Sequence, residues 1–239
     1  MRGPRLVRVR NRLVHFFCRL LLALGCALCV AAAQAPPVAS APPAPPTITF
    51  TFDLPQTDPS HYVIAVDAGG NASYQAHGDD PDDSPYRFEF RVSDSARDSL
   101  FAAARELNYF QGDFDYRKSR IAFTGAKKLD YTSPDQQGST TYNWSQDVRI
   151  QRITTFFQNL SNTLEFGRRI GYLHKHDKLG IDAELKRMEE MARNGDLAEL
   201  QVVAPVLQKV AADPAVINLA RKRAEALLAR IPAPSAAHP

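Results

Sequence analysis

Alternating hydrophobic and polar residues open the patterned part of the chain. Over residues 47–54, apolar side chains occupy every second position between Thr and Asp, which predicts a half-buried strand. The same period recurs over 62–66, 72–76 and 86–92, and the stretch DAGGN after the first of these supplies the residues of a hairpin turn. Because such alternation leaves one sheet face solvated, we expect an antiparallel sheet.

Helical spacing then interrupts the strand pattern. We expect a helix that is capped by Asp94 or Ser95 and carries one apolar stripe. Further short strands are expected near 121–123, 129–131 and 141–142, because apolar pairs there are separated by Gly-, Ser- and Pro-containing turns.

The segment from Ile150 to Leu173 has two hydrophobic stripes. The first stripe contains Ile150, Ile153, Phe156, Phe157, Leu160 and Leu164, and the second contains Phe166, Ile170 and Leu173. On a helical wheel the two lie on roughly opposite sides, and a helix that buried one stripe throughout would not change sides near Glu165. We therefore expect a helix, capped by Ser145 or Asp147, whose first turns pack on the sheet and whose last turns pack on another layer.

The rest of the pattern is helical. A helix over 182–194 should end at Gly195, and Asp196–Glu199 has the capping-box spacing that predicts the start of another helix. Pro205 would lie inside that helix and kink it, and Asp213 followed by Pro would end it and begin the last helix.

These patterns predict an α+β fold: an antiparallel sheet with two helices on one face, followed by a small C-terminal helical bundle. The expected organisation is a signal peptide (1–35), a Pro/Ala-rich linker (36–46), an α+β sheet domain (47–172), a helical subdomain (173–231) and a disordered tail (232–239).

Residues 1–35 have the composition of a secretory signal peptide. Six arginines and no acid precede the apolar run Leu20–Ala33, which is too short to span a bilayer, and residues 33–35 (AQA) offer a small-residue cleavage site. The alternative is a lipoprotein anchored at Cys26. In either case we expect an exported protein, periplasmic or extracellular.

Removal of this segment changes the charge and the cysteine chemistry. The chain has 29 basic and 26 acidic residues, so the loss of six arginines leaves 23 basic residues and a net charge of −3. A nucleic-acid or anionic-membrane partner argued from overall charge would rest on the removed segment. All three cysteines (Cys18, Cys26 and Cys29) are lost with it, so the mature chain would have no disulfide and no thiolate site.

Two clusters contain residue types that bind metals. His174-Lys175-His176-Asp177 is similar to the HxHxDH run of the metallo-β-lactamase superfamily, but its Asp comes one residue early and no His follows. Residues two apart on a helix point to different sides, which favours a polar helix terminus or loop. The acidic stretch Asp79–Asp83 could bind calcium, yet it lacks EF-hand spacing, so a solvated loop is favoured.

The remaining candidate chemistry is weaker. Glu106 and Asp113 could act as paired carboxylates, although helix-end charges beside core aromatics explain them better. A basic segment could bind anions or could protect exposed strand edges; it contains Arg117, Lys118, Arg120, Lys127 and Lys128 beside Tyr116 and Tyr131. The chain contains no GxSxG, P-loop or GxGxxG motif, so we assign no catalytic, cofactor-binding or metal-binding residue and expect no cofactor.

Two parts of the chain resemble known families. Residues 47–172 resemble secreted bacterial domains of the β-lactamase-inhibitor-like type through the DAGGNASY hairpin, the helix ending in LNYF and the FTGAKKLDY strand. Residues 205–231 resemble one HEAT-type helical hairpin, except that Ile217 stands where that family usually has arginine. The first resemblance implies a binding module and the second implies a helical packing element.

The function we expect is that of an exported non-catalytic module that binds a protein or a cell-envelope component. The alternatives are an envelope hydrolase with dispersed active-site residues and a structural envelope protein. We expect no nucleic-acid partner and no transmembrane helix in the mature chain; the oligomeric state stays open.

Overall fold

The computed structural model describes residues 44–78 and 85–232. The expected signal peptide, most of the Pro/Ala-rich linker, the Asp79–Asp83 stretch and all but Pro232 of the expected tail lie outside these described residues. All of the described residues belong to one compact unit.

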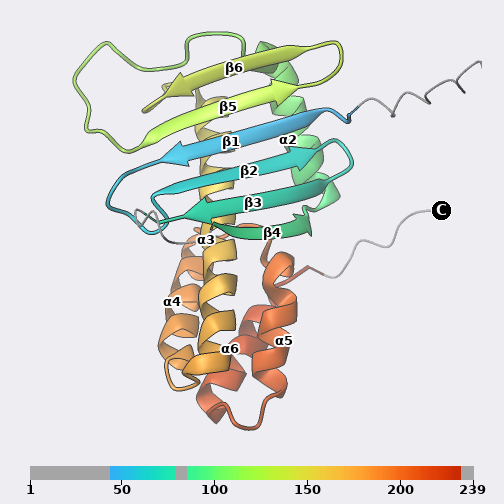
Figure 1. Ribbon diagram of the computed structural model, residues 1–239, viewed down its shortest axis with the longest axis vertical. Helices are drawn as coiled ribbons and strands as arrows, with labels where there is room; N and C mark the ends of the chain where they lie inside the picture. Colours follow the sequence, from blue (N-terminus) through green and yellow to red (C-terminus); the bar gives the residue numbers. More distant parts are fainter. Residues whose placement is uncertain (1–43, 79–84, 233–239) are drawn as a thin grey trace, which may run out of the picture. The chain divides into compact units, whose positions relative to one another are not determined.

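Six strands form one antiparallel sheet, which confirms the α+β class (Figure 1). The strands are β1 (Thr47–Asp53), β2 (His61–Asp67), β3 (Asn71–His77), β4 (Tyr86–Arg91), β5 (Ala126–Thr132) and β6 (Gln137–Tyr142). Their order is β4-β3-β2-β1-β5-β6, so that β4 and β6 are the edge strands.

The alternating apolar residues line one face of this sheet. Phe50 is fully buried, lies opposite Ile64 on β2 and Leu129 on β5, and stacks on Phe157 with ring centroids 5.0 Å apart. Burying an aromatic side chain of this size stabilises the fold by about 1.5–3 kcal/mol. The hairpin between β2 and β3 turns at Gly70, whose φ of 84° lies in the left-handed region that glycine adopts without strain.

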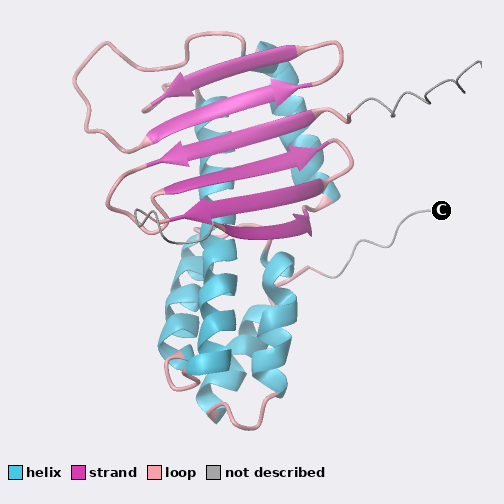
Figure 2. Ribbon diagram, viewed as in Figure 1, coloured by secondary structure: helices cyan, strands magenta, loops and turns pink. Residues whose placement is uncertain are grey.

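Five α-helices and two 3₁₀ turns complete the described part of the chain (Figure 2). They are α2 (Asp94–Glu106), η1 (Asn108–Phe110), α3 (Val148–His176), α4 (Ile181–Asn194), η2 (Leu200–Val203), α5 (Ala204–Ala212) and α6 (Asn218–Leu228). Figure 1 shows α2 and the first half of α3 on the same side of the sheet. Ser93 caps α2 through its side chain, one residue before the expected cap, whereas α3 is capped by Asp147 as expected.

The long helix α3 belongs to two hydrophobic cores, as its two stripes predict. Ile150, Phe157 and Leu160 pack with the sheet and α2 in the first core. Phe166 and Ile170 pack with α4, α5 and α6 in the second core. Gly167 allows η2 to approach α3 closely, because a Cβ atom there would lie 2.6 Å from a Val203 methyl group.

The expected strand at 121–123 is wrong. Residues 111–125 form no strand, and the side chains of Ile121 and Phe123 are 37% and 61% exposed. The Asn143 side chain holds this backbone in place of a strand partner: it accepts from the Thr124 N–H at 2.8 Å and donates to the Ala122 carbonyl at 2.9 Å. Two alternating apolar residues are too short a pattern to specify a strand.

The expected start of the helix that contains Pro205 is also wrong. The helix α5 begins at Ala204, so Pro205 lies in its first turn, where its missing N–H costs nothing. Glu199 does not cap this helix; its backbone is left-handed, with φ of 54°, and its carboxylate accepts hydrogen bonds from Ser93 at the start of α2. Likewise α6 begins at Asn218, several residues after Asp213, and Val216 is buried in the connection before it.

Candidate functional site

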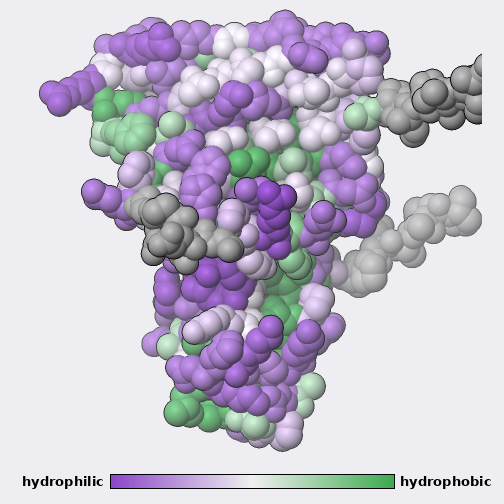
Figure 3. Space-filling view, viewed as in Figure 1, coloured by the Kyte–Doolittle hydropathy of each residue, from purple (hydrophilic) through white to green (hydrophobic). Residues whose placement is uncertain are grey.

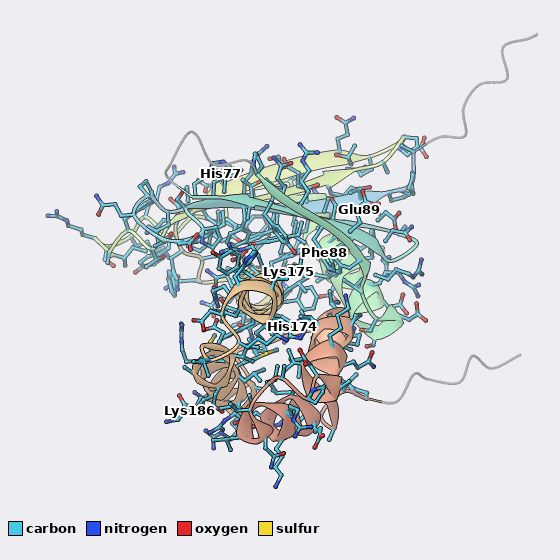
Figure 4. All side chains as sticks on the ribbon, turned by 60° about the horizontal axis from the view of Figure 1, so that its bottom comes forward. His77, Phe88, Glu89, His174, Lys175 and Lys186 are labelled. Atoms are coloured by element: carbon cyan, nitrogen blue, oxygen red, sulfur yellow. The ribbon has the colours of Figure 1, made fainter. Side chains whose placement is uncertain are left out.

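The two histidines of the 174–177 cluster do not converge. The His174 ring nitrogen Nε2 lies 2.9 Å from the Asp213 carboxylate, which also accepts from Lys178, whereas His176 packs against the Tyr172 ring. Figure 4 shows His174 and Lys175 on different sides of α3. Since α3 ends at His176, the interpretation as a polar helix terminus is confirmed. Within residues 44–78 and 85–232, no group of three His, Cys, Asp or Glu side chains is placed to hold a metal ion.

The other candidate residues are dispersed. Asp113 pairs with Arg117 at 3.4 Å in the loop after η1, and Glu106 is the last residue of α2. The basic segment does not share one face either: Lys128 pairs with Asp130 on the exposed side of β5, whereas Lys127 points into the protein. The structure therefore does not assemble an anion-binding patch from the whole segment.

The region that contains this segment instead forms an apolar pocket of about 310 Å³. Its wall combines the loop 111–125 with the connection between β6 and α3, and it consists of Tyr116, Ile121, Ala122, Thr124, Trp144 and Gln146. The Tyr116 N–H donates to the Trp144 carbonyl at 2.8 Å, and the two rings meet edge to face with centroids 5.2 Å apart. Backbone pairing and ring contact together fix the loop against Trp144.

A carboxylate holds the base of this loop. Asp115 accepts from the Asn143 N–H at 2.9 Å and from the Arg117 guanidinium at 3.1 Å. The hydrogen bond from Asn143 is the main cause that lowers the pKa of Asp115 below its usual value, and Arg117 adds to it. Arg117 is therefore engaged within the loop and is not free for an anionic ligand.

Exposed apolar side chains occur in the pocket wall and next to it in the chain: Ile121 and Trp144 line the pocket, Phe123 lies between two lining residues in the sequence, and Val148 follows Gln146 by two residues. Ile121, Phe123, Trp144 and Val148 are 37%, 61%, 39% and 66% exposed, and we call these four residues the Trp144 rim. They make up half of the large hydrophobic side chains that are exposed in the described part of the chain. Figure 3 shows hydrophobic side chains where the loop before β5 leads into that strand, inward of the hydrophilic outer end of the loop. Clustered apolar exposure of this kind typically marks an interaction site, whereas single exposed residues do not.

A second pocket of about 290 Å³ adjoins the first and shares Thr124 and Trp144 with it. Its other walls are mainly amide and hydroxyl side chains, among them Asn143, Gln151, Thr155 and Gln158. Such groups both donate and accept hydrogen bonds without carrying charge. The two pockets together therefore offer an apolar chamber beside a neutral polar one.

Lys127 is the one charged residue in the wall of the polar chamber. It is 5% exposed, and its Nζ donates to the carbonyls of Asn143 (2.8 Å), Gly125 (2.9 Å) and Thr124 (3.1 Å). Burial lowers the pKa of Lys127 to about 8, so that the amine stays mostly protonated at neutral pH. Since three carbonyls accept its three protons, Lys127 holds the loop in place and has no proton left for a ligand.

A cleft beside β3 contains Glu165, Arg168, His77, Tyr86 and Asp58. Glu165 is buried, and its two oxygens accept from the Tyr74 hydroxyl at 3.0 Å and from Arg168 Nε at 2.7 Å. Burial, with Glu165 beside it, raises the pKa of Tyr74 far above its usual value. One oxygen of the buried acid therefore holds α3 against β3 through Tyr74, the other pairs with Arg168 on the same helix, and we assign no acid–base role to it.

No model of a known protein family matches this chain, and a search of curated proteins finds no match. None of the helices in the described ranges combines the length and the apolar character that a membrane crossing requires.

Proposed function

We propose that this protein is a non-catalytic binding module that holds a large apolar side chain of a partner protein in the pocket beside Trp144. The observation that carries the proposal is the Trp144 rim: two of its four exposed apolar side chains, Ile121 and Trp144, line an apolar pocket, and the other two are adjacent in the chain to lining residues. Aromatic residues are enriched at protein interfaces, and the anchors that dominate binding insert into pockets of this kind.

The charges around the pocket indicate an uncharged anchor. Arg117 is paired with Asp113 and Asp115, and the three protons of Lys127 are used by backbone carbonyls. An anionic or cationic group placed in the pocket would lose its hydration without gaining a partner. An aromatic or aliphatic side chain would gain free energy by leaving water.

The size of the pocket and the neighbouring chamber indicate a segment of polypeptide. At about 310 Å³ the apolar pocket lies at the lower end of the range for small-molecule sites. The polar chamber beside it offers the amide side chains of Gln151 and Gln158, whereas the Asn143 amide is engaged by the loop. These groups are suited to pair with the main-chain amides on either side of an inserted side chain.

The sequence also supports proposals about where the protein acts and how its helices are arranged. We propose export through the signal peptide of residues 1–35, or anchoring at Cys26 as the alternative, with the partner in the cell envelope or outside the cell. We also propose that two helices cover one sheet face and that a small C-terminal helical bundle follows. The division of the buried residues into two clusters that share α3 supports this arrangement.

The experiment selects random displayed peptides on the purified protein and follows their binding through tryptophan fluorescence. Trp144 is the single tryptophan of the sequence, so the signal reports on this pocket alone. We expect selected peptides to contain one large apolar residue and to shift the emission to shorter wavelengths. Phe123→Ser and Ile121→Ser should each weaken binding about tenfold, as expected for residues around a buried anchor.

The matched control is Leu179→Ser, at a leucine that is 78% exposed in the turn after α3. This variant removes a similar apolar area elsewhere and should leave affinity unchanged. Equal losses for Leu179→Ser and Phe123→Ser would show non-specific hydrophobic binding and would overturn the proposal. Selected peptides that leave the Trp144 emission unchanged would do the same.

A further inference from the structure

The two edge strands of the sheet differ in how far other residues cover them. The outer edge of β6 is covered: a Cβ atom at Gly138 would lie 1.9 Å from the Tyr109 carbonyl, and the Gln111 side chain donates to the Gln137 carbonyl at 2.7 Å. The Asn143 N–H beyond β6 is bound by Asp115. The other edge, β4, has no comparable cover among residues 44–78 and 85–232.

The register of β4 shows which backbone groups face outward. The Val92 N–H donates to the Gly70 carbonyl at 3.0 Å, and the pairing continues as Phe90↔Ala72 and Phe88↔Tyr74. Hydrogen-bonded pairs alternate along an antiparallel ladder, so even-numbered residues of β4 bond to β3. The N–H and C=O groups of Arg87 and Glu89 therefore point away from the sheet, and no described residue pairs with them.

The face of β4 that is turned toward the helices is aromatic and only half-buried. Tyr86, Phe88 and Phe90 stack in a row, with ring centroids 6.5 Å and 5.9 Å apart. Tyr86 and Phe88 line an apolar groove of about 230 Å³, whose other wall includes Val202 and Val206 of η2 and α5. Figure 3 shows a hydrophobic strip below β4 that continues toward α5.

The opposite face of β4 carries free charges. Arg87 and Glu89 are exposed and form no ion pair with any described residue, whereas Arg91 is held by Asn71 and the Gly69 carbonyl. Figure 4 shows Phe88 toward the helices and Glu89 away from them. A strand beside β4 would therefore meet apolar groups on one face and a basic–acidic pair on the other.

We propose that β4 accepts an extended segment of a partner protein as a seventh, antiparallel strand. Backbone hydrogen bonds to Arg87 and Glu89 would supply affinity, and alternate side chains would enter the groove toward α5, as in other cases of strand addition. Charge complementarity places a basic residue opposite Glu89 and an acidic one opposite Arg87. The segment that fits reads apolar–basic–apolar–acidic–apolar from its N-terminus.

The sequence of β4 itself, YRFEF, matches this pattern, so a second copy is the obvious rival occupant. The positions of the helices argue against a second copy as the occupant. Figure 1 shows the second half of α3 and the helix α5 continuing past β4 on the side of the sheet that α2 covers. A second copy that extended the sheet would bring its own α2 and α3 into that occupied layer. A single strand without helices behind it meets no such obstacle.

The test uses a fluorescent peptide of residues 85–92, PYRFEFRV, and its charge-swapped isomer PYEFRFRV, with binding followed by anisotropy. We expect the first peptide to bind the protein on the order of tenfold more tightly, because the isomer places like charges opposite each other. The double variant Arg87→Glu/Glu89→Arg should reverse this preference. Both residues are exposed, so the variant retains the core.

A second pair of peptides tests the backbone pairing. N-methylation at the peptide residue equivalent to Glu89 removes an N–H that faces β4 and should abolish binding. The same change at the residue equivalent to Phe88 modifies an N–H that faces solvent and should be tolerated. Equal effects would overturn strand addition.

Two further outcomes decide against the proposal. If neither peptide binds, Arg87 and Glu89 only guard the edge against association. If sedimentation shows a dimer that Arg87→Glu disrupts, the occupant is a second copy and not a partner strand.

Discussion

Lys127 shows how one residue holds the candidate site together. Its ammonium group connects the loop before β5 to the Asn143 carbonyl after β6, and no carboxylate in the described ranges pairs with it. A buried cation that is satisfied by carbonyls alone is sensitive to substitution, because the same carbonyls would be left without donors.

Replacing this amine should therefore cost stability and loosen the loop. For Lys127→Met we expect a loss of about 1–3 kcal/mol in unfolding free energy, the usual cost of leaving buried polar groups unpaired. Urea unfolding measures the loss, and Trp144 emission should shift to longer wavelengths in the folded variant. The neighbouring Lys128→Met is the control, since Lys128 is half-exposed and pairs only with Asp130. An unchanged urea midpoint for Lys127→Met would show that the amine is dispensable.

The site was only partly predictable from single residues. Because side chains alternate along a strand, the inward positions of Leu129 and Tyr131 already place Lys127 on the buried face. The sequence alone therefore suffices to predict that Lys127 and Lys128 lie on opposite faces of β5. Trp144 carried no pattern of its own, and only the fold brings it beside Ile121 and Tyr116.

At the scale of elements, α3 is the part of the fold that the sequence predicts best. Its stripes change sides between Leu164 and Phe166, and these two residues belong to different hydrophobic clusters. The prediction holds because a period of 3.6 sustained over several turns leaves few alternatives.

Replacing a large side chain in the first or the second half of α3 should loosen different parts of the protein. Phe157 and Phe166 are 0% and 1% exposed, so replacing either with Ala should cost about 3–5 kcal/mol. Phe157→Ala should lower amide-exchange protection first in the sheet. Phe166→Ala should lower it first in α4, α5 and α6. Hydrogen exchange read residue by residue makes the comparison, and identical protection patterns in the two variants would mean that the molecule has one undivided core.

The elements that were mispredicted depend on long-range contacts. Glu199 has capping-box spacing, yet its carboxylate reaches Ser93 on another helix, and this contact draws residues 196–199 out of helical geometry. The alternation at Ile121 and Phe123 predicts a strand, but the edge of β6 where such a strand would pair is covered by η1 and Asp115. No local pattern contains that information.

At the scale of the whole described unit, polar contacts tie the helices of the second core to one another and to the sheet. Asp213, in the connection between α5 and α6, accepts from Lys178 at 2.6 Å and contacts His174 at 2.9 Å. The hydrogen bond from Lys178 is the main cause that lowers the pKa of Asp213 to about 2, and the Ala215 N–H and His174 add to it.

This pairing should make part of the stability depend on pH. Because the folded-state pKa lies below the unfolded value of 3.8, the contact stabilises the fold above pH 4, and its contribution disappears as the pH falls toward 2. Asp213→Asn should therefore unfold at lower urea than the unchanged protein at pH 5, and the gap should be much smaller at pH 2, where about half of the folded-state carboxylate is protonated. Asp135→Asn, in the exposed turn before β6, serves as the control. A gap of constant size from pH 5 to pH 2 would contradict the ionic origin.

The position of β1 in the sheet has a consequence for the order in which the protein assembles. β1 is the first strand along the chain, yet it lies between β2 and β5 and pairs with both. The hairpins from β1 to β4 close over short loops, whereas the pairing of β1 with β5 must bring together Asp53 and Ala126, with α2 between them in the chain. This closure has the largest entropy cost in the sheet and is the step expected to limit the folding rate. Until it happens, the strand TITFTFD leaves the backbone N–H and C=O groups of one edge unpaired and the apolar side chains of one face uncovered by α3. Pairing with β5 and packing of α3 are therefore expected to remove a site at which other chains could aggregate.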